Sequence, residues 1–257
     1  MDRIRTFIDQ YKAQYSGGDG WTFEDSCMLK GLADLYRAAG DPSDRRWVLD
    51  FLSRRVQADG AVTGLDARDP AAVSCGKAFF FALDETGDQR WRKAADDLHA
   101  HLSALPDEPE DLYLVEPFRT EYDSRWLSGL EAAGIARRFA RAGQQPGGTE
   151  GWCLLALADC IEAMPEQLYE HRRVLMDLFL AGARKLLPSE HGPDTASRAM
   201  KAYALLKGVR LGLLDPERYL APGHAAFREL EEHLPGMEAN PQTVGLFMMA
   251  LSERLRS

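Results

Sequence analysis

Long apolar runs, strand-like alternation and positive charge are all scarce in this sequence, and each scarcity excludes a class of protein. No apolar stretch approaches the roughly 18 residues that a membrane-spanning helix needs. The opening residues, 1–15, carry charges throughout and do not resemble a secretory signal peptide. Long alternating runs of β-branched residues are almost absent, which argues against a sheet protein. We therefore expect a helical, cytoplasmic protein that does not enter a membrane.

The scarcity of positive charge also bears on the partner. Lys and Arg number 31 against 40 Asp and Glu, so the net charge is −9 and the pI is about 5.2. An acidic surface argues against nucleic acid or an anionic membrane as the partner. An acidic small substrate remains compatible, because a single Arg or a helix N-terminus can bind a carboxylate inside an acidic protein.

The cysteines favour neither disulfides nor a metal site. The four of them form no Cys-x-x-Cys pair and lie in apolar helical stretches, at Cys27, Cys75, Cys153 and Cys160. No His stands beside them at ligand spacing, so we expect reduced thiols and no zinc.

What the sequence does contain is a passage that occurs twice. Residues 21–52 and 74–102 each read as an apolar helix, a turn ending in Gly-Asp, and a second helix with Trp and Arg. A repeat of roughly 45 residues built as a helical hairpin predicts a stacked or closed all-helical array. No linker divides the chain, so residues 1–257 are expected to form one domain.

Apolar periodicity and the Pro and Gly breaks predict twelve helices. Their expected ranges are 2–15, 24–39, 43–58, 73–86, 88–105, 110–122, 124–142, 149–163, 166–187, 194–213, 216–233 and 240–256. Helices that are apolar on nearly all sides alternate with amphipathic, charged ones, as expected of buried and covering helices. Six buried and six covering helices predict an all-α (α/α)6 toroid of six helical hairpins, with the first helix closing the ring against the last.

In such a ring, the amino ends of the inner helices point to one face. Their unpaired N–H groups and dipoles attract anions and hydroxyl-rich ligands, so the residues near these ends are candidates for a site. Tryptophan stacks on sugar rings, and carboxylates bind hydroxyls or transfer protons. Helix capping explains Asp, Ser, Thr and Asn at the same positions, and burial in the core explains Trp21 and Trp152.

Five segments together resemble the unsaturated glucuronyl and rhamnogalacturonyl hydrolases, glycoside hydrolase families 88 and 105. The segments occur in the family's order over most of the chain, at residues 21–41, 74–96, 111–118, 150–165 and 196–215. The resemblance implies an (α/α)6 barrel, no metal and no cofactor. It also implies a substrate whose non-reducing end is a 4,5-unsaturated uronic acid. In this family an Asp protonates the C4=C5 double bond, water adds at C5, and the resulting hemiketal releases the sugar.

The resemblance implies where the acid would lie, and the sequence departs from the family there. The family's main acid/base Asp corresponds to Glu110, with Asp111 beside it, and a second family Asp corresponds to Ala72. The chain is also shorter than typical members, around residues 143–149 and 187–195. Asp66 and Asp69 lie in the loop before Ala72 and could approach the cleft.

Two hypotheses follow. The favoured one is an enzyme, a hydrolase of unsaturated-uronyl type acting on a small oligosaccharide, with Glu110 or Asp111 as acid/base. Its substrate-binding residues would be Trp21, Glu24, Asp69, Arg119, Trp152 and Arg198, although surface ion pairs also explain the two arginines. The alternative is a catalytically degenerate sugar-binding or assembly protein on the same fold, favoured by Ala72. The sequence leaves the sugar, the linkage and a homodimer open.

Overall fold

The computed structural model describes residues 2–18, 20–66, 68–105, 108, 111–143, 150–187, 194–234 and 239–257. Within them lie twelve α-helices: α1 (Asp2–Gln14), α2 (Phe23–Ala39), α3 (Pro42–Ser53), α4 (Pro70–Thr86), α5 (Arg90–His101), α6 (Leu112–Tyr122), α7 (Ala132–Ala142), α8 (Glu150–Ala163), α9 (Tyr169–Leu186), α10 (Thr195–Arg210), α11 (Pro216–His233) and α12 (Pro241–Arg256). Short 3-10 helices occur at η1 (Leu102–Ala104) and η4 (Glu166–Leu168), and a π-helix at η3 (Asp123–Leu127). None of the helices described is long and apolar enough to cross a membrane.

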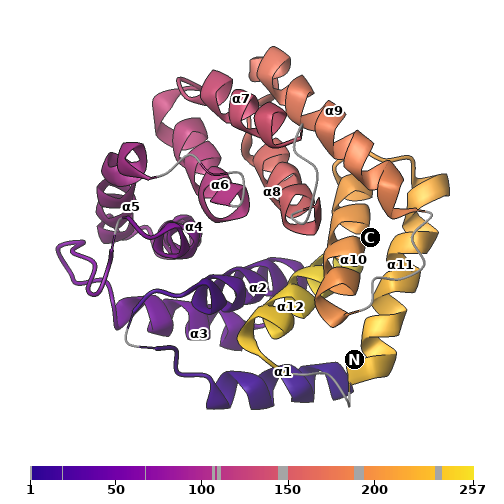
Figure 1. Ribbon diagram of the computed structural model, residues 1–257. Helices are drawn as coiled ribbons and strands as arrows, with labels where there is room; N and C mark the ends of the chain where they lie inside the picture. The colour runs from indigo at the N-terminus through magenta and orange to yellow at the C-terminus, as the bar shows by residue number, and fades with distance from the viewer. Residues whose placement is uncertain are drawn as a thin grey trace.

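The even-numbered helices form a closed inner ring, and the odd-numbered ones cover it (Figure 1). Around the ring α2 packs on α4, then α6, α8, α10 and α12 follow in order, and α12 returns to α2. Each covering helix packs beside an inner one, as α3 does on α2 and α5 on α4. The predicted all-α toroid of six hairpins is therefore confirmed.

Helix α1 closes the outer layer through buried charge. The carboxylate of Asp44, on α3, is fully buried and lies 2.7 Å from both Arg5 and Lys12 of α1. Ring packing reinforces the contact, since Tyr15 stacks on Trp47 and Phe7 meets Phe247 of α12 edge-on. The first helix thus covers the junction between the start and the end of the ring, as expected.

A recurring pair of residues starts several helices. Asp or Asn at the N-cap is followed by Pro at the first helical position in α3, α4, α11 and α12. The cap side chain accepts a hydrogen bond from a backbone N–H of the first turn, and Pro lacks the N–H that would stay unpaired there. Gly40 and Gly87, the repeated turn glycines, end α2 and α4 at positive φ, which a glycine adopts without strain.

The helix expected over 124–142 is divided in two. The chain continues from α6 as the π-helix η3 and then turns at Ser128 and Gly129, both at positive φ. Two successive left-handed residues interrupt a right-handed helix, so α7 begins only at Ala132. The range expected as 43–58 likewise ends at Ser53, and a loop with an isolated Val56–Val62 bridge follows.

The ring closes where α2 and α12 meet at two glycines. A Cβ built on Gly245 would lie 2.5 Å from the backbone carbonyl of Cys27, and one on Gly31 would lie 2.7 Å from the carbonyl oxygen of Gly245. No side chain fits between the two backbones at this point. The glycines therefore fix how closely the last inner helix approaches the first.

Replacing Gly245 by Ala should destabilise the protein by about 2–3 kcal/mol, because the added methyl would force two packed backbones apart. The midpoint of urea unfolding measures this. The matched control is Gly134→Ala in α7, where the new Cβ would meet only the ends of flexible Arg side chains. That change should be neutral or stabilising by about 0.5–1 kcal/mol, since Ala favours a helix over Gly. Equal effects of the two variants would contradict the closure argument.

Candidate functional site

The amino ends of three inner helices meet at a cluster of aromatic rings. Phe23 of α2, Tyr113 of α6 and Trp152 of α8 have ring centroids 4.6 to 6.2 Å apart, tilted or edge-on to one another. Phe23 and Trp152, about 130 residues apart in the sequence, thereby come into contact across the ring. We call these residues the three-ring cluster.

Beside this cluster lies a cavity of about 350 Å³, the amino-end cavity. Trp152 forms one wall, and polar groups come from the starts of α10 and α12, at Asp194, Ser197, Lys201 and Gln242. Burial lowers the pKa of the Lys201 ammonium, with partial compensation from Glu229. An aromatic face beside amide, hydroxyl and charged groups is suited to a small hydroxyl-rich ligand.

Two predicted acids lie near the three-ring cluster along the chain. Glu24 follows Phe23 and is exposed, while Asp111 precedes α6 and lines a smaller recess of about 210 Å³. That recess also contains Glu108, Glu116 and Arg119. Glu110, the other predicted acid/base residue, lies outside the described residues.

Trp21 and Asp69 have structural partners. The indole of Trp21 is buried, donates a hydrogen bond from Nε1 to the carbonyl oxygen of Thr63 at 2.9 Å, and packs edge-on against Phe79. Asp69 is exposed and caps α4, since its carboxylate accepts a hydrogen bond from the N–H of Ala71 at 2.9 Å. Ala72, at the departure from the family pattern, is buried in the core.

The two predicted arginines are paired with carboxylates. Arg119 lies 3.4 Å from both Glu116 and Glu131, between α6 and the start of α7. Arg198 lies 3.6 Å from Glu229 and links α10 to α11. These ion pairs tie inner helices to covering ones, so the structure does not bring the arginines together with Trp152.

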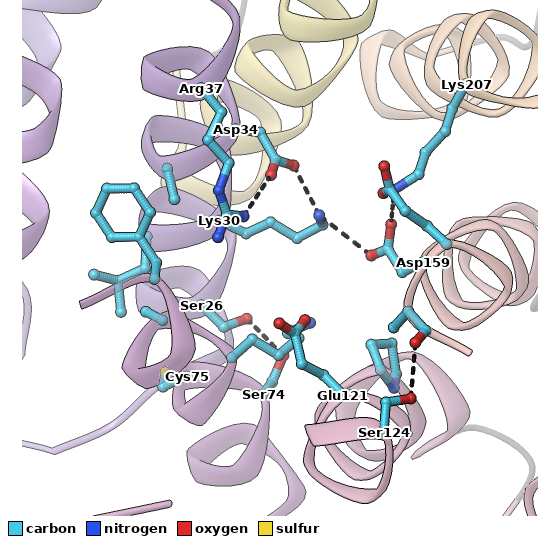
Figure 2. Close-up of a pocket in the computed structure, with 18 of the residues that line it drawn as sticks. Ser26, Lys30, Asp34, Arg37, Ser74, Cys75, Glu121, Ser124, Asp159 and Lys207 are labelled. Carbon is cyan, nitrogen blue, oxygen red and sulfur yellow. Dashed lines mark hydrogen bonds and ion pairs between the residues drawn. The ribbon is translucent and has the colours of Figure 1, made fainter. Parts of the chain in front are cut away.

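The largest cavity described, about 570 Å³, lies toward the other end of the ring and contains none of the predicted residues. All six inner helices line it, mostly through their middle turns and carboxyl halves, although Ser26 lies in the first turn of α2; we call it the axial cavity (Figure 2). Its lining includes the carboxylates of Asp34, Glu121, Asp159 and Glu162 and the cationic residues Lys30, Arg37, Lys77, Arg125, Lys207 and Arg256.

A network of ion pairs spans the axial cavity. The Lys30 ammonium lies 2.7 Å from Asp34 and 3.3 Å from Asp159, and Lys207 lies 2.6 Å from Asp159 (Figure 2). Burial opposes the charged form of Asp159, but Lys207 and Lys30 outweigh it and hold the pKa of this carboxyl well below its ordinary value. Glu162 behaves in the same way, since Lys207 and Arg210 lower its pKa to about 2.

Lys77 differs from the other lysines of this cavity. Its ammonium lies 4.2 Å from the ring centroid of Tyr113 and donates a weak hydrogen bond, at 3.4 Å, to the Tyr113 carbonyl oxygen. Among the residues described, no carboxylate forms an ion pair with it, whereas Lys30 and Lys207 each have two. Burial and the neighbouring Lys30 lower the pKa of Lys77 to about 8.

A signal for the axial cavity was present in the sequence. A charge among buried residues needs a polar surrounding. Lys77 interrupts the apolar stretch of residues 70–83, and Lys30 lies between the buried Leu29 and Gly31 in α2. The candidates chosen at the amino ends of the inner helices could not include them, because both lie a full turn or more inside their helices.

Comparisons with known proteins show what this fold resembles. No protein-family model and no curated protein matches the chain. Among solved structures, a family 105 glycoside hydrolase of C. acetobutylicum ATCC 824 has a TM-score of 0.80 at 18% identity, covering 96% of this chain and 98% of its own. A family 88 glycosyl hydrolase from Bacteroides vulgatus has a TM-score of 0.79 at 13% identity, covering 99% of both chains. A polysaccharide lyase has a TM-score of 0.80 at 16% identity, covering 99% and 97%.

The chain therefore has the fold of these glycoside hydrolases along its whole length, and the fold resemblance noted in the sequence is confirmed. One of these structures is named a lyase and the other two are named hydrolases, so proteins with this ring of helices are named for different reactions. The fold alone thus leaves the reaction open.

Asp159→Asn should destabilise the protein by about 3–5 kcal/mol, because it leaves Lys30 and Lys207 buried with less opposing charge. The folded-state pKa of Asp159 is below its ordinary 3.8, so its stabilisation is present above about pH 4 and is lost as the pH falls. Denaturant unfolding between pH 7 and pH 2 should therefore show a shallower acid loss in the variant than in the wild type.

The matched control is Asp84→Asn. Asp84 also pairs with an arginine, Arg125, but its side chain is 42% exposed. A surface pair contributes about 0–1 kcal/mol, so this variant should stay close to the wild type at pH 7. A loss as large as that of Asp159→Asn would contradict the importance of the buried network.

Proposed function

We propose that this protein is a glycoside hydrolase that acts on unsaturated uronyl or related small oligosaccharides at the amino end of its ring. The observation that carries the proposal is the amino-end cavity, where Trp152 offers an aromatic wall beside the polar groups of α10 and α12. The fold, shared with glycoside hydrolases over nearly the whole length of both chains, supports it.

In the proposed reaction, Asp111 or Glu110 acts as the acid and base. One carboxyl group gives its proton to C4 of the C4=C5 double bond, and the carboxylate then takes a proton from the water that adds at C5. The hemiketal so formed collapses and releases the sugar. A general acid or base in position typically contributes 10²- to 10⁴-fold to the rate. The amino ends of α2, α6 and α8 favour the negative charge of a uronate nearby.

Within this proposal, the surroundings of each remaining candidate residue decide whether it contacts the sugar. Trp152 supplies the face on which the sugar ring stacks. Glu24, exposed at the start of α2, accepts a hydrogen bond from a sugar hydroxyl. Trp21, Asp69, Arg119 and Arg198 are assigned no direct contact with the sugar, because each already has a partner in the folded chain.

A second candidate function is sugar binding without turnover. It is favoured by one observation, the burial of Ala72 in the apolar core at the position where the resembling family carries a second Asp. With the nearby Asp69 engaged as a helix cap, α4 contributes no carboxylate to the reaction from this position.

Turnover of an unsaturated uronyl disaccharide tests the proposal, followed by the loss of absorbance of the conjugated double bond. Asp111→Asn or Glu110→Gln should lower kcat by about 10²-fold or more, since the proton donor is removed. Trp152→Ala should chiefly raise KM. The control Glu217→Gln lies exposed on the covering helix α11 and should retain activity.

Two results would contradict the assignment. If the wild type binds the disaccharide but does not turn it over, the second candidate function stands in its place. If neither binding nor turnover is found across a panel of unsaturated uronides, both are excluded.

A further inference from the structure

We propose that the axial cavity is a second ligand site, which binds a small sugar acid with its carboxylate on Lys77. This site lies toward the opposite end of the ring from the amino-end cavity and shares none of the lining residues described there. The ring of Tyr113 lies between the two cavities. Its centroid is 4.6 Å from a ring centroid of Trp152 and 4.2 Å from the Lys77 ammonium.

The charge of the lining selects an anion. Six cationic residues face four carboxylates in a protein whose net charge is −9. Most of the cations are neutralised: Lys30 and Lys207 by the buried network, Arg125 by Asp84 and Glu121, and Arg256 by Glu253. Arg37, at the exposed rim, forms only long ion pairs, at 3.9 Å with Asp34 and 3.8 Å with Asp84.

Among the cationic residues that line the axial cavity, Lys77 is the one for which the described residues supply no ion pair with a carboxylate. An ammonium removed from water is stabilised when an anion approaches it, so a ligand carboxylate at this point supplies the missing partner. One such ammonium matches one negative charge, which favours a carboxylate over a phosphate dianion.

The rest of the lining is suited to hydroxyl groups. Ser26 and Ser74, both buried, form a hydroxyl pair with an Oγ–Oγ distance of 3.0 Å, and Asp34 and Asp159 offer acceptor oxygens (Figure 2). A volume of about 570 Å³ lies within the range of small-molecule sites. Since the carboxylates are already paired with ammonium groups, the site favours a polyhydroxylated acid over a metal ion.

Binding of D-glucuronate, followed by titration calorimetry at pH 7, tests the proposal, with D-glucose and D-glucose 6-phosphate as the neutral and phosphate probes. The wild type should bind glucuronate and bind glucose at least about tenfold more weakly. Lys77→Met should weaken glucuronate binding by about tenfold or more. Trp152→Ala, which removes a lining residue of the amino-end cavity and none of the axial cavity, should leave the Lys77-dependent binding in place.

The stability of the unliganded protein separates a binding role from a structural one. If Lys77 serves a ligand, Lys77→Met should unfold at a higher urea concentration than the wild type, because a partly buried ammonium that forms no ion pair with the described carboxylates is removed. If Lys77 serves only to pack on Tyr113, the same variant should unfold earlier.

The pH dependence gives a third readout. Loss of the Lys77 proton above about pH 8 should weaken glucuronate binding by about tenfold or more between pH 7 and pH 9.5, and Lys77→Met should lack this dependence. The other groups that face Lys77 keep their state over this range. Burial raises the pKa of Cys27 to about 12 and those of Cys75 and Tyr113 well above their ordinary values; the pKa of Lys30 is raised and that of Asp159 lowered.

Four results would overturn the proposal: no glucuronate binding by the wild type, equal binding of glucose, unchanged binding by Lys77→Met, or loss of all binding in Trp152→Ala. Tighter binding of glucose 6-phosphate than of glucuronate would overturn the choice of a carboxylate.

Discussion

The approach of α12 to α2 is the contact on which the rest of the structure depends. Gly31 and Gly245 let two backbones meet where a single Cβ would collide with a carbonyl group. The last helix of the chain thereby joins the first inner helix and turns a row of hairpins into a ring. The axial cavity exists because the ring is closed, since all six inner helices line it.

Closure shields the middle of the ring partly from bulk water, and this limits which side chains can line it. Aromatic rings occupy the amino end of the axis, whereas paired charges occupy the carboxyl half. A buried charge requires a partner, because the free-energy cost of removing an isolated ion from water exceeds the stabilisation that one weak contact provides. Lys30, Asp159 and Lys207 satisfy this requirement together, whereas the partly buried Lys77 forms no ion pair with a carboxylate among the residues described.

The sequence predicted the fold more fully than the site, for physical reasons. The start of α11 was readable because Asp215 precedes Pro216, a local signal that does not depend on the rest of the chain. The expected ranges did not take account of the same signal at Asp69-Pro70, and α4 begins three residues before its expected start at residue 73. The break at Ser128 and Gly129 was missed, because Ser rarely takes a left-handed conformation and the apolar pattern continues across it. Residues of a site must meet in space, and the sequence does not state where side chains point.

The predicted site residues illustrate this limit. Trp152 joins Phe23 and Tyr113 at the amino end, but Trp21, at the equivalent place in the chain, turns into the core and bonds to Thr63. Arg119 and Arg198 lie on helices that border the ring, yet each points to a covering helix and its carboxylate. The axial cavity was not predicted because its charged residues lie inside the helices, whereas the helix dipole argument points only to their amino ends.

Helix dipoles explain why the two ends of the ring differ in charge. At the carboxyl end the inner helices direct their partial negative charge inward, and cationic side chains in the last turns, such as Arg37, Lys207 and Arg256, offset it. Cations gathered for this reason are held by the helix ends and by carboxylates, so they do not by themselves attract a ligand. Lys77 lies in the middle of α4 and its ammonium lies beside Tyr113 at the amino end of α6, away from the carboxyl ends, so its charge is not offset in this way. An anion entering the axial cavity is therefore directed to Lys77 and not to the larger group of cations at the rim.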